Sequence, residues 1–295
     1  MKELKKQLWL IGLSFCACLI FLILILNPFS TRGDHTITIG AKNCTEQIIL
    51  AEIFATLIEE RTEIEVVRRH LEGTSICFQS LLSGDVDLYF EYTGTALLNI
   101  LKETTFPGDL YSYLKERFSD KYGLIWLDRL GFSNHYGLVV RAETPYRTIT
   151  DIAKDPRLRL AFDPEFTARS EFNLIKGSYP IPEEWKPKLM DQVLLYFSLL
   201  NESVDVISGE TTHGRLVDSS CVFLEDNCNA LPKYEVAALT SKTCLEKFPE
   251  IISLSKLLSG KITEKKMRNL NHAVEFEGVE VKDLARDFLI EQGLL

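Results

Sequence analysis

Apolar residues recur along the chain in two patterns. At every second position they predict β-strands, and at spacings of three and four they predict helices with one apolar face. The predicted strands are residues 36–40, 64–68, 85–90, 132–140, 158–162, 204–207, 222–224 and 231–239. The predicted helices are residues 48–60, 72–82, 96–101, 110–118, 149–153, 166–175, 193–200, 249–258, 264–274 and 281–292. Strands that alternate with helices predict an α/β protein with parallel sheets.

Two predicted strands divide the chain into two α/β units. They lie near residues 136–140 and 234–239, and each is expected to cross from one unit to the other. We therefore expect a first, discontinuous lobe of residues 34–139 and 239–295, and a second lobe of residues 140–238. Clefts between such lobes bind small molecules.

One strand end carries candidate binding chemistry. The strand at residues 85–90 runs into Glu-Tyr-Thr-Gly-Thr at residues 91–95, and a helix follows. The carboxyl ends of strands in an open α/β sheet are where ligands bind. The ring of Tyr92, the hydroxyl of Thr95 and the amides of the helix end are therefore expected to meet at a ligand site.

The first 33 residues have the features of an export segment. Lys2, Lys5 and Lys6 precede residues 8–26, which carry no charge, and Asn27-Pro28 ends this apolar run. Such a segment is either a cleaved signal or a retained membrane anchor. Both predict an extracytoplasmic, periplasmic location, and the anchor would attach the protein to the cytoplasmic membrane through residues 8–26.

Charge and cysteine content exclude several classes of protein. The net charge of −9 argues against a nucleic-acid partner, whose phosphates need a basic surface. The seven cysteines show no CxxC pair or zinc spacing, and Cys221 and Cys228 could either pair or stay free. Because no nucleophile elbow or phosphate-binding loop is present, we expect no enzyme, no catalytic residue, no metal and no cofactor.

Five spaced segments resemble, in the same order, those of the glycine betaine/choline-binding proteins of osmoprotectant ABC transporters. They are residues 42–47, 91–95, 130–136, 165–169 and 232–234, and the resemblance extends over residues 36–295. It implies a type II periplasmic-binding fold with two lobes and a two-strand hinge. It also implies a small zwitterionic or quaternary ammonium ligand, an ABC permease partner in the inner membrane, and a monomer.

The same resemblance assigns roles to individual residues. An aromatic cage attracts a quaternary ammonium, which cannot donate a hydrogen bond, through the faces of its rings. A carboxylate at the other end of the ligand needs cations or hydroxyls. The implied assignments are Tyr92, Tyr136 and Tyr234 as cage rings, Lys42 and Arg169 on the carboxylate, Thr95 as a ligand hydroxyl, Asn134 beside the cation, and Gln47 as a weaker candidate.

The segment at residues 210–214 departs from the family pattern. Glu210 stands where the family has a cage ring, and His213 stands in place of an aspartate. A carboxylate there favours an amino-acid-like ligand with a primary or less methylated ammonium, or with a guanidinium. Alternatively, Glu210 points out of the cleft and Tyr196 supplies the missing ring. A membrane-tethered ligand sensor that feeds no permease is a further alternative.

Overall fold

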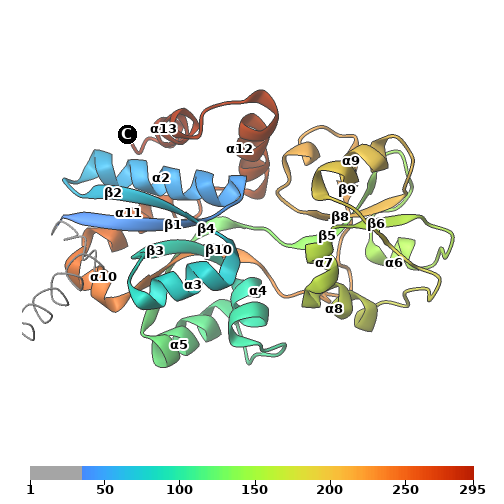
Figure 1. Cartoon of the computed structure of the whole chain (residues 1–295), viewed down its shortest axis with the longest axis horizontal. Helices are drawn as coiled ribbons and strands as arrows, with labels where there is room; N and C mark the ends of the chain where they lie inside the picture. The colour runs from blue at the N-terminus through green and yellow to red at the C-terminus, as the bar shows by residue number, and fades with distance from the viewer. Residues whose placement is uncertain (1–34) are drawn as a thin grey trace, which may run out of the picture. The chain divides into compact units, whose positions relative to one another are not determined.

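The computed structural model describes residues 35–295, which form two five-stranded sheets with helices around each (Figure 1). The predicted export segment, with its alternatives of cleavage and anchoring, lies outside the described residues. Within residues 35–295, no helix combines the length and the apolar character needed to cross a membrane. Two packed α/β units confirm the predicted α/β class, but the prediction of parallel sheets is wrong because both sheets also contain antiparallel pairs.

The first sheet has the strand order β2-β1-β3-β10-β4. β1 pairs in parallel with β3, whereas β10 runs antiparallel between β3 and β4. The strands are β1 (Thr36–Lys42), β2 (Glu65–Leu71), β3 (Leu88–Tyr92), β4 (Leu124–Ser133) and β10 (Glu235–Ser241). The carboxyl ends of β1 and β3 therefore open at the same edge, as the sequence predicts for Tyr92.

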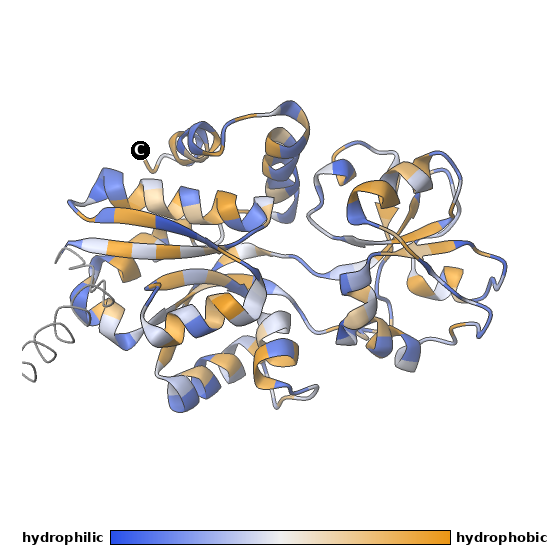
Figure 2. Cartoon of the chain, in the orientation of Figure 1, coloured by the Kyte–Doolittle hydropathy of each residue, from blue (hydrophilic) through white to orange (hydrophobic). Residues whose placement is uncertain are grey.

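Helices cover both faces of this sheet (Figure 1), and the hydrophobic residues of its strands (Figure 2) are buried in two apolar clusters. One face packs around Phe54 and Phe90, and the other around Phe118 and Trp126. The first group is α2 (Thr45–Arg61), α11 (Glu250–Leu258), α12 (Glu264–Glu277) and α13 (Val281–Glu291). The second group is α3 (Gly73–Ser83), the π-helix η1 (Ala96–Leu101) and α5 (Leu110–Tyr122). The short helices α4 (Thr93–Thr95) and α10 (Lys242–Lys247) complete this unit.

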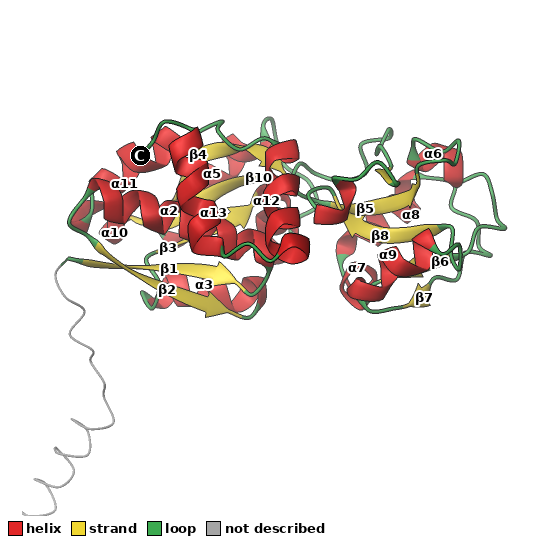
Figure 3. Cartoon of the chain, turned by 90° about the horizontal axis from the view of Figure 1, so that it is seen from above, coloured by secondary structure: helices red, strands yellow, loops and turns green. Residues whose placement is uncertain are grey.

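The second sheet has the strand order β7-β6-β8-β5-β9, again with helices on its faces (Figure 3). Its strands are β5 (Tyr136–Arg141), β6 (Leu160–Phe162), β7 (Lys188–Leu189), β8 (Val206–Glu210) and β9 (Cys221–Phe223). Its helices are α6 (Ile149–Ile152), α7 (Pro164–Ala168), α8 (Ser170–Ser178), α9 (Gln192–Leu200) and the 3-10 helix η2 (Gly214–Leu216). Cys221 and Cys228 are free thiols, so the pairing alternative is wrong here.

The chain passes between the sheets twice, between β4 and β5 and between β9 and β10. The two linking segments lie side by side, because the amide of Asn134 donates to the carbonyl of Tyr234 at 3.0 Å. The single strand predicted for residues 132–140 is therefore wrong. Apolar residues stay at every even position on both sides of Asn134-His135, as in one continuous strand. The hydrogen-bonding partners of the backbone nevertheless change there from one sheet to the other. The predicted lobe limits, which fall within β5 and β10, stay a prediction.

Candidate ligand-binding site

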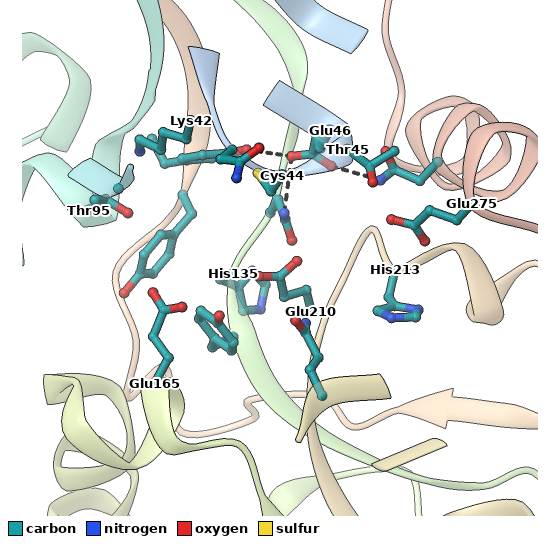
Figure 4. Close-up of a pocket in the computed structure, with 18 of the residues that line it drawn as sticks. Lys42, Cys44, Thr45, Glu46, Thr95, His135, Glu165, Glu210, His213 and Glu275 are labelled. Carbon is teal, nitrogen blue, oxygen red and sulfur yellow. Dashed lines mark hydrogen bonds between the residues drawn. The ribbon is translucent and has the colours of Figure 1, made fainter. Parts of the chain in front are cut away.

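A pocket of about 760 Å³ lies between residues of the first and second sheets. Its lining includes all the residues that the sequence nominated for ligand binding except the weaker candidate Gln47: Lys42, Tyr92, Thr95, Asn134, Tyr136, Arg169, Glu210 and Tyr234. Figure 4 shows Lys42, Thr95 and Glu46 on one side of this pocket, with Glu165 and Glu210 reaching in from the other. The fold thus brings together residues separated by up to about two-thirds of the chain.

Lys42 is the last residue of β1, and its ammonium already has a partner. It contacts the carboxylate of Glu91 on the neighbouring strand β3, which is fully buried. The ammonium also lies 5.0 Å from the centre of the Tyr92 ring. Lys42 therefore faces the pocket with its charge balanced by Glu91.

Tyr92 and Tyr234 provide two of the predicted rings from the first unit. Tyr92 ends β3, and Tyr234 immediately precedes β10. The ring of Tyr234 lies so close to Gly94 that a Cβ on residue 94 would be 2.5 Å from it. The hydroxyl of Tyr234 donates to Glu171 of α8 at 2.9 Å. Only glycine at position 94 allows this ring to lie against the turn that carries Thr95.

Tyr136 and Arg169 face the pocket from the second unit. Tyr136 begins β5, and Arg169 lies between α7 and α8. The guanidinium carbon is 5.1 Å from the centre of the Tyr136 ring. Its Nε lies 3.6 Å from Glu165 and 3.8 Å from Glu171, so Arg169 forms ion pairs with both acids. Arg169 nevertheless lines the pocket, so these pairs are not confined to the surface.

Glu210 ends β8 directly opposite Tyr136 and lines the pocket. The alternative in which Glu210 points out of the cleft is therefore wrong, although Tyr196 also lines the pocket and stacks on His213 at 4.2 Å. Enclosure raises the pKa of Glu210 from 4.5 to about 7, and the carboxylates of Glu46 and Glu165 add to that rise. An acid in this environment takes up a proton close to neutral pH.

Glu46 was not nominated from the sequence as a site residue, yet it is the most heavily bonded acid in the pocket. It accepts hydrogen bonds from Tyr92 at 2.7 Å, Asn134 at 3.1 Å, Thr212 at 2.5 Å and Asn271 at 3.1 Å. Burial raises the pKa of its carboxyl, and the four donors oppose that rise. These donors come from β3, the first linking segment, the loop after β8 and α12.

The sequence also misplaces the start of α2. The spacing of Asn43 and Glu46 predicts a side-chain cap, but the cap residue is Cys44 and no side chain caps it. Asn43 instead donates to Glu72 at 3.0 Å. Glu46 points into the pocket because four hydrogen-bond donors from distant segments surround its carboxylate. The spacing of residues within the helix start does not predict these donors.

The loop after β8 forms a further contact between the two units. Arg268 of α12 donates to the carbonyl of Thr211 at 2.6 Å, and Asn271 donates to that of Thr212 at 2.9 Å. A Cβ at Gly214 would lie 2.9 Å from the backbone of His272. The second unit is therefore tied to the first at α12 as well as through the two linking segments.

Two histidines also line the pocket. The alternation of a strand would place His135 on the face opposite to its neighbour Tyr136, but both residues line the pocket. Burial lowers the pKa of His135 and of His213 to about 4, so both rings are neutral at pH 7. Gln47 is buried in α2 and is absent from the lining of this pocket.

The family described as the substrate-binding domain of ABC-type glycine betaine transport systems matches residues 35–291. The chain belongs to this family. It is the substrate-binding component of an ABC transport system and not an enzyme. The resemblance stated from the five sequence segments is thereby confirmed.

Curated relatives show what similar chains bind. A carnitine transport binding protein, OpuCC, of Listeria monocytogenes serotype 1/2a is 31% identical over 269 residues, which is 87% of each chain. The ergothioneine transport permease/ergothioneine binding protein EgtU of Helicobacter pylori strain G27 is 29% identical over 290 residues. That match covers 94% of this chain but only 52% of the Helicobacter protein, so this chain spans about half of it.

Solved structures support the same fold. The crystal structure of a glycine betaine/carnitine/choline ABC transporter protein matches with a TM-score of 0.78 and 27% identity, over 88% of this chain and 99% of that one. The ligand-free YehZ protein of Escherichia coli matches with a TM-score of 0.71 at 20% identity, which supports the fold alone.

Proposed function

We propose that this protein captures a small zwitterionic osmoprotectant of the glycine betaine, choline or carnitine type and delivers it to an ABC permease in the inner membrane. The observation that carries the proposal is the pocket itself. Three tyrosine rings and a guanidinium, drawn from both units, face one space large enough for such a ligand. Carnitine binding by the Listeria relative supports the same ligand class.

The cation of the ligand would rest against Tyr92, Tyr136 and Tyr234. A trimethylammonium group is attracted to ring faces without needing a hydrogen bond. Asn134 would lie beside the cation, at the link between the two units. The rings come from both units, so a bound cation would hold the units together.

The carboxylate of the ligand would bind Arg169, with Lys42 and Thr95 nearby. The ion pairs of Arg169 with Glu165 and Glu171, at 3.6 and 3.8 Å, exceed hydrogen-bonding distance. Its N–H groups can therefore bind a ligand carboxylate in the bidentate manner that arginine favours. Lys42 would contribute less, because Glu91 already balances its charge.

The architecture supports a hinged mechanism of the type II periplasmic-binding class. The two linking segments would act as the hinge, and the two units, each built on one of the sheets, would close on the ligand. The protein would work as a monomer outside the cytoplasm, attached to the cytoplasmic membrane by residues 8–26. The permease would recognise the closed, loaded form.

A thermal-shift panel tests this proposal. Glycine betaine, choline and carnitine are compared with neutral sugars and dicarboxylates at the same concentration. At least one quaternary ammonium compound should raise the melting temperature, because a ligand that binds only the folded state stabilises it. A panel in which no quaternary ammonium compound shifts the melting temperature contradicts the proposal.

A second candidate ligand is an amino-acid-like cation with a primary ammonium or a guanidinium. Glu210 favours it, because this carboxylate faces the pocket and could accept hydrogen bonds that a quaternary ammonium cannot donate. Arginine and lysine belong in the same panel for this reason. Stabilisation by these amino acids without any response to betaines would favour the second candidate.

A further inference from the structure

Two of the three basic side chains in the pocket lining already lie beside acids of the protein. Lys42 is paired with Glu91, and Arg169 lies within 4 Å of both Glu165 and Glu171. The lining itself holds five carboxylates against three cations: Glu46, Glu72, Glu165, Glu210 and Glu275 against Lys42, Arg169 and Arg215. A ligand that only balances charge, such as glycine betaine, leaves this acidic excess in place.

Glu210 has few hydrogen-bonding partners within the protein. Among residues 35–295, none of the ion pairs includes it, and the hydroxyl of Tyr136 is the side chain that donates to it. Glu46, by contrast, accepts from four donors. A carboxylate has room for about four hydrogen bonds, so Glu210 keeps acceptor capacity toward the pocket.

A second polar side chain of the pocket lining, Tyr196, has an unsatisfied hydroxyl. Tyr196 is only 1% exposed, it lines the pocket, and its hydroxyl has no hydrogen-bond partner in the described part of the chain. A Cβ at Gly209, the residue before Glu210, would lie 2.9 Å from that hydroxyl. The glycine thus lets the hydroxyl of Tyr196 approach the end of β8. Buried polar groups in folded proteins are nearly always hydrogen-bonded, so the hydroxyl of Tyr196 lacks a partner that a ligand can supply.

We propose that Glu210, with Tyr196 beside it, selects betaines that carry an O–H or N–H donor in addition to the quaternary ammonium. The inference rests on the proposed function and narrows its ligand class. A donor aimed at Glu210 makes a charge-assisted hydrogen bond, which is stronger than a neutral one. When the cleft closes over a betaine without such a donor, the carboxylate of Glu210 loses its hydrogen bonds to water and forms none in their place. This desolvation weakens binding.

Two matched ligands test the inference. L-carnitine and γ-butyrobetaine share the trimethylammonium group, chain length and carboxylate, and differ only in one hydroxyl. Isothermal titration calorimetry of the wild-type protein should give a dissociation constant about tenfold lower for carnitine. Glu210→Ala should bring the two constants together, and Glu210→Gln should reduce the ratio.

Glu225→Gln is the matched control, since Glu225 is an exposed glutamate of the same unit that lies two residues after β9. This variant should keep the wild-type ratio. Circular dichroism melts establish that each variant is folded. Choline and ethyltrimethylammonium, which also differ by one hydroxyl, repeat the comparison on the wild-type protein without any substitution.

The outcomes separate the inference from the proposed function. Equal affinity of the wild-type protein for both members of each pair overturns the inference and leaves the proposed function standing. A preference for carnitine that survives in Glu210→Ala overturns the role of Glu210. Failure of all four compounds and of glycine betaine to bind contradicts the proposed function itself.

Discussion

At the scale of a single residue, Tyr92 has two separate roles, one for its ring and one for its hydroxyl. Its ring lines the pocket, and its hydroxyl donates to the buried carboxylate of Glu46 at 2.7 Å. Removing the ring and removing the hydroxyl should therefore have different consequences. A pair of substitutions at this position can separate binding from stability.

Tyr92→Ala should weaken the binding of a quaternary ammonium ligand by about 1–2 kcal/mol, because one cation–π face is lost. Tyr92→Phe keeps the face, so its affinity should stay close to wild type. The loss of the hydroxyl should lower its free energy of unfolding by about 1–3 kcal/mol, because Glu46 loses a donor. Calorimetry and urea unfolding measure the two effects. An unchanged dissociation constant in Tyr92→Ala would rule out this ring as part of the site.

Glu210 should make stability depend on pH. Its pKa rises from 4.5 to about 7 in the folded protein, because the site encloses it and because Glu46 and Glu165 repel its charge, while Arg169 and Tyr136 oppose the rise. The folded state therefore binds this proton more tightly than the unfolded state. The ionised residue destabilises the fold above about pH 7, and the cost disappears as the pH falls toward 4.5.

Glu210→Gln removes this cost. Relative to wild type, the variant should be more stable at pH 8 by roughly 1–3 kcal/mol, after allowance for solvent screening, and should show little difference at pH 4.5. Urea unfolding of both proteins at the two pH values gives the comparison. A stability difference that does not change between pH 4.5 and pH 8 would show that Glu210 is not held in this environment.

At the scale of elements, helix α12 reaches across to the second unit. Asn271 donates to both Glu46 and the carbonyl of Thr212, at 3.1 and 2.9 Å. Asn271→Ala should lower the free energy of unfolding by about 1–3 kcal/mol, because two buried acceptors lose a donor. Asn269→Ala, two residues earlier and exposed on the same helix, is the matched control. Urea unfolding should separate the two variants, and equal stability would mean that α12 does not hold the loop after β8.

The sequence predicts most of these elements because the periodicity of apolar residues records which face is buried. It predicts β1 and the helix at α2 for this reason. The periodicity of apolar residues does not show which neighbouring strand a segment pairs with. Residues 132–140 were therefore predicted as one strand, although the chain passes from the first sheet to the second at Asn134-His135. The contact of α12 with the loop after β8 joins residues about 60 positions apart and leaves no local pattern.

In the candidate site too, the sequence predicts which residues line the pocket but not which side chains they contact. Spaced motifs were enough to nominate eight residues that do line one pocket. The partners that decide their chemistry were not predicted, since the pairing of Lys42 with Glu91 and the burial of Glu46 depend on side chains from other strands and helices. A motif can therefore predict where a side chain lies before it can predict how its charge is balanced.

At the scale of the whole molecule, ligand binding should change the arrangement of the two units. The proposed ligand contacts Tyr92 and Tyr234 from the first and Tyr136 and Arg169 from the second, so it should favour the closed arrangement. Small-angle X-ray scattering should show a smaller radius of gyration at saturating ligand. A neutral sugar at the same concentration is the control. An unchanged radius with ligand bound would mean that the cleft does not close on it.

The most direct test of the whole account is a crystal structure of the protein with the betaine that stabilises it most in the thermal-shift panel. We predict a trimethylammonium group against the rings of Tyr92, Tyr136 and Tyr234, and a carboxylate within hydrogen-bonding distance of Arg169. A ligand bound outside this pocket, or one whose carboxylate lies away from Arg169, would contradict the account.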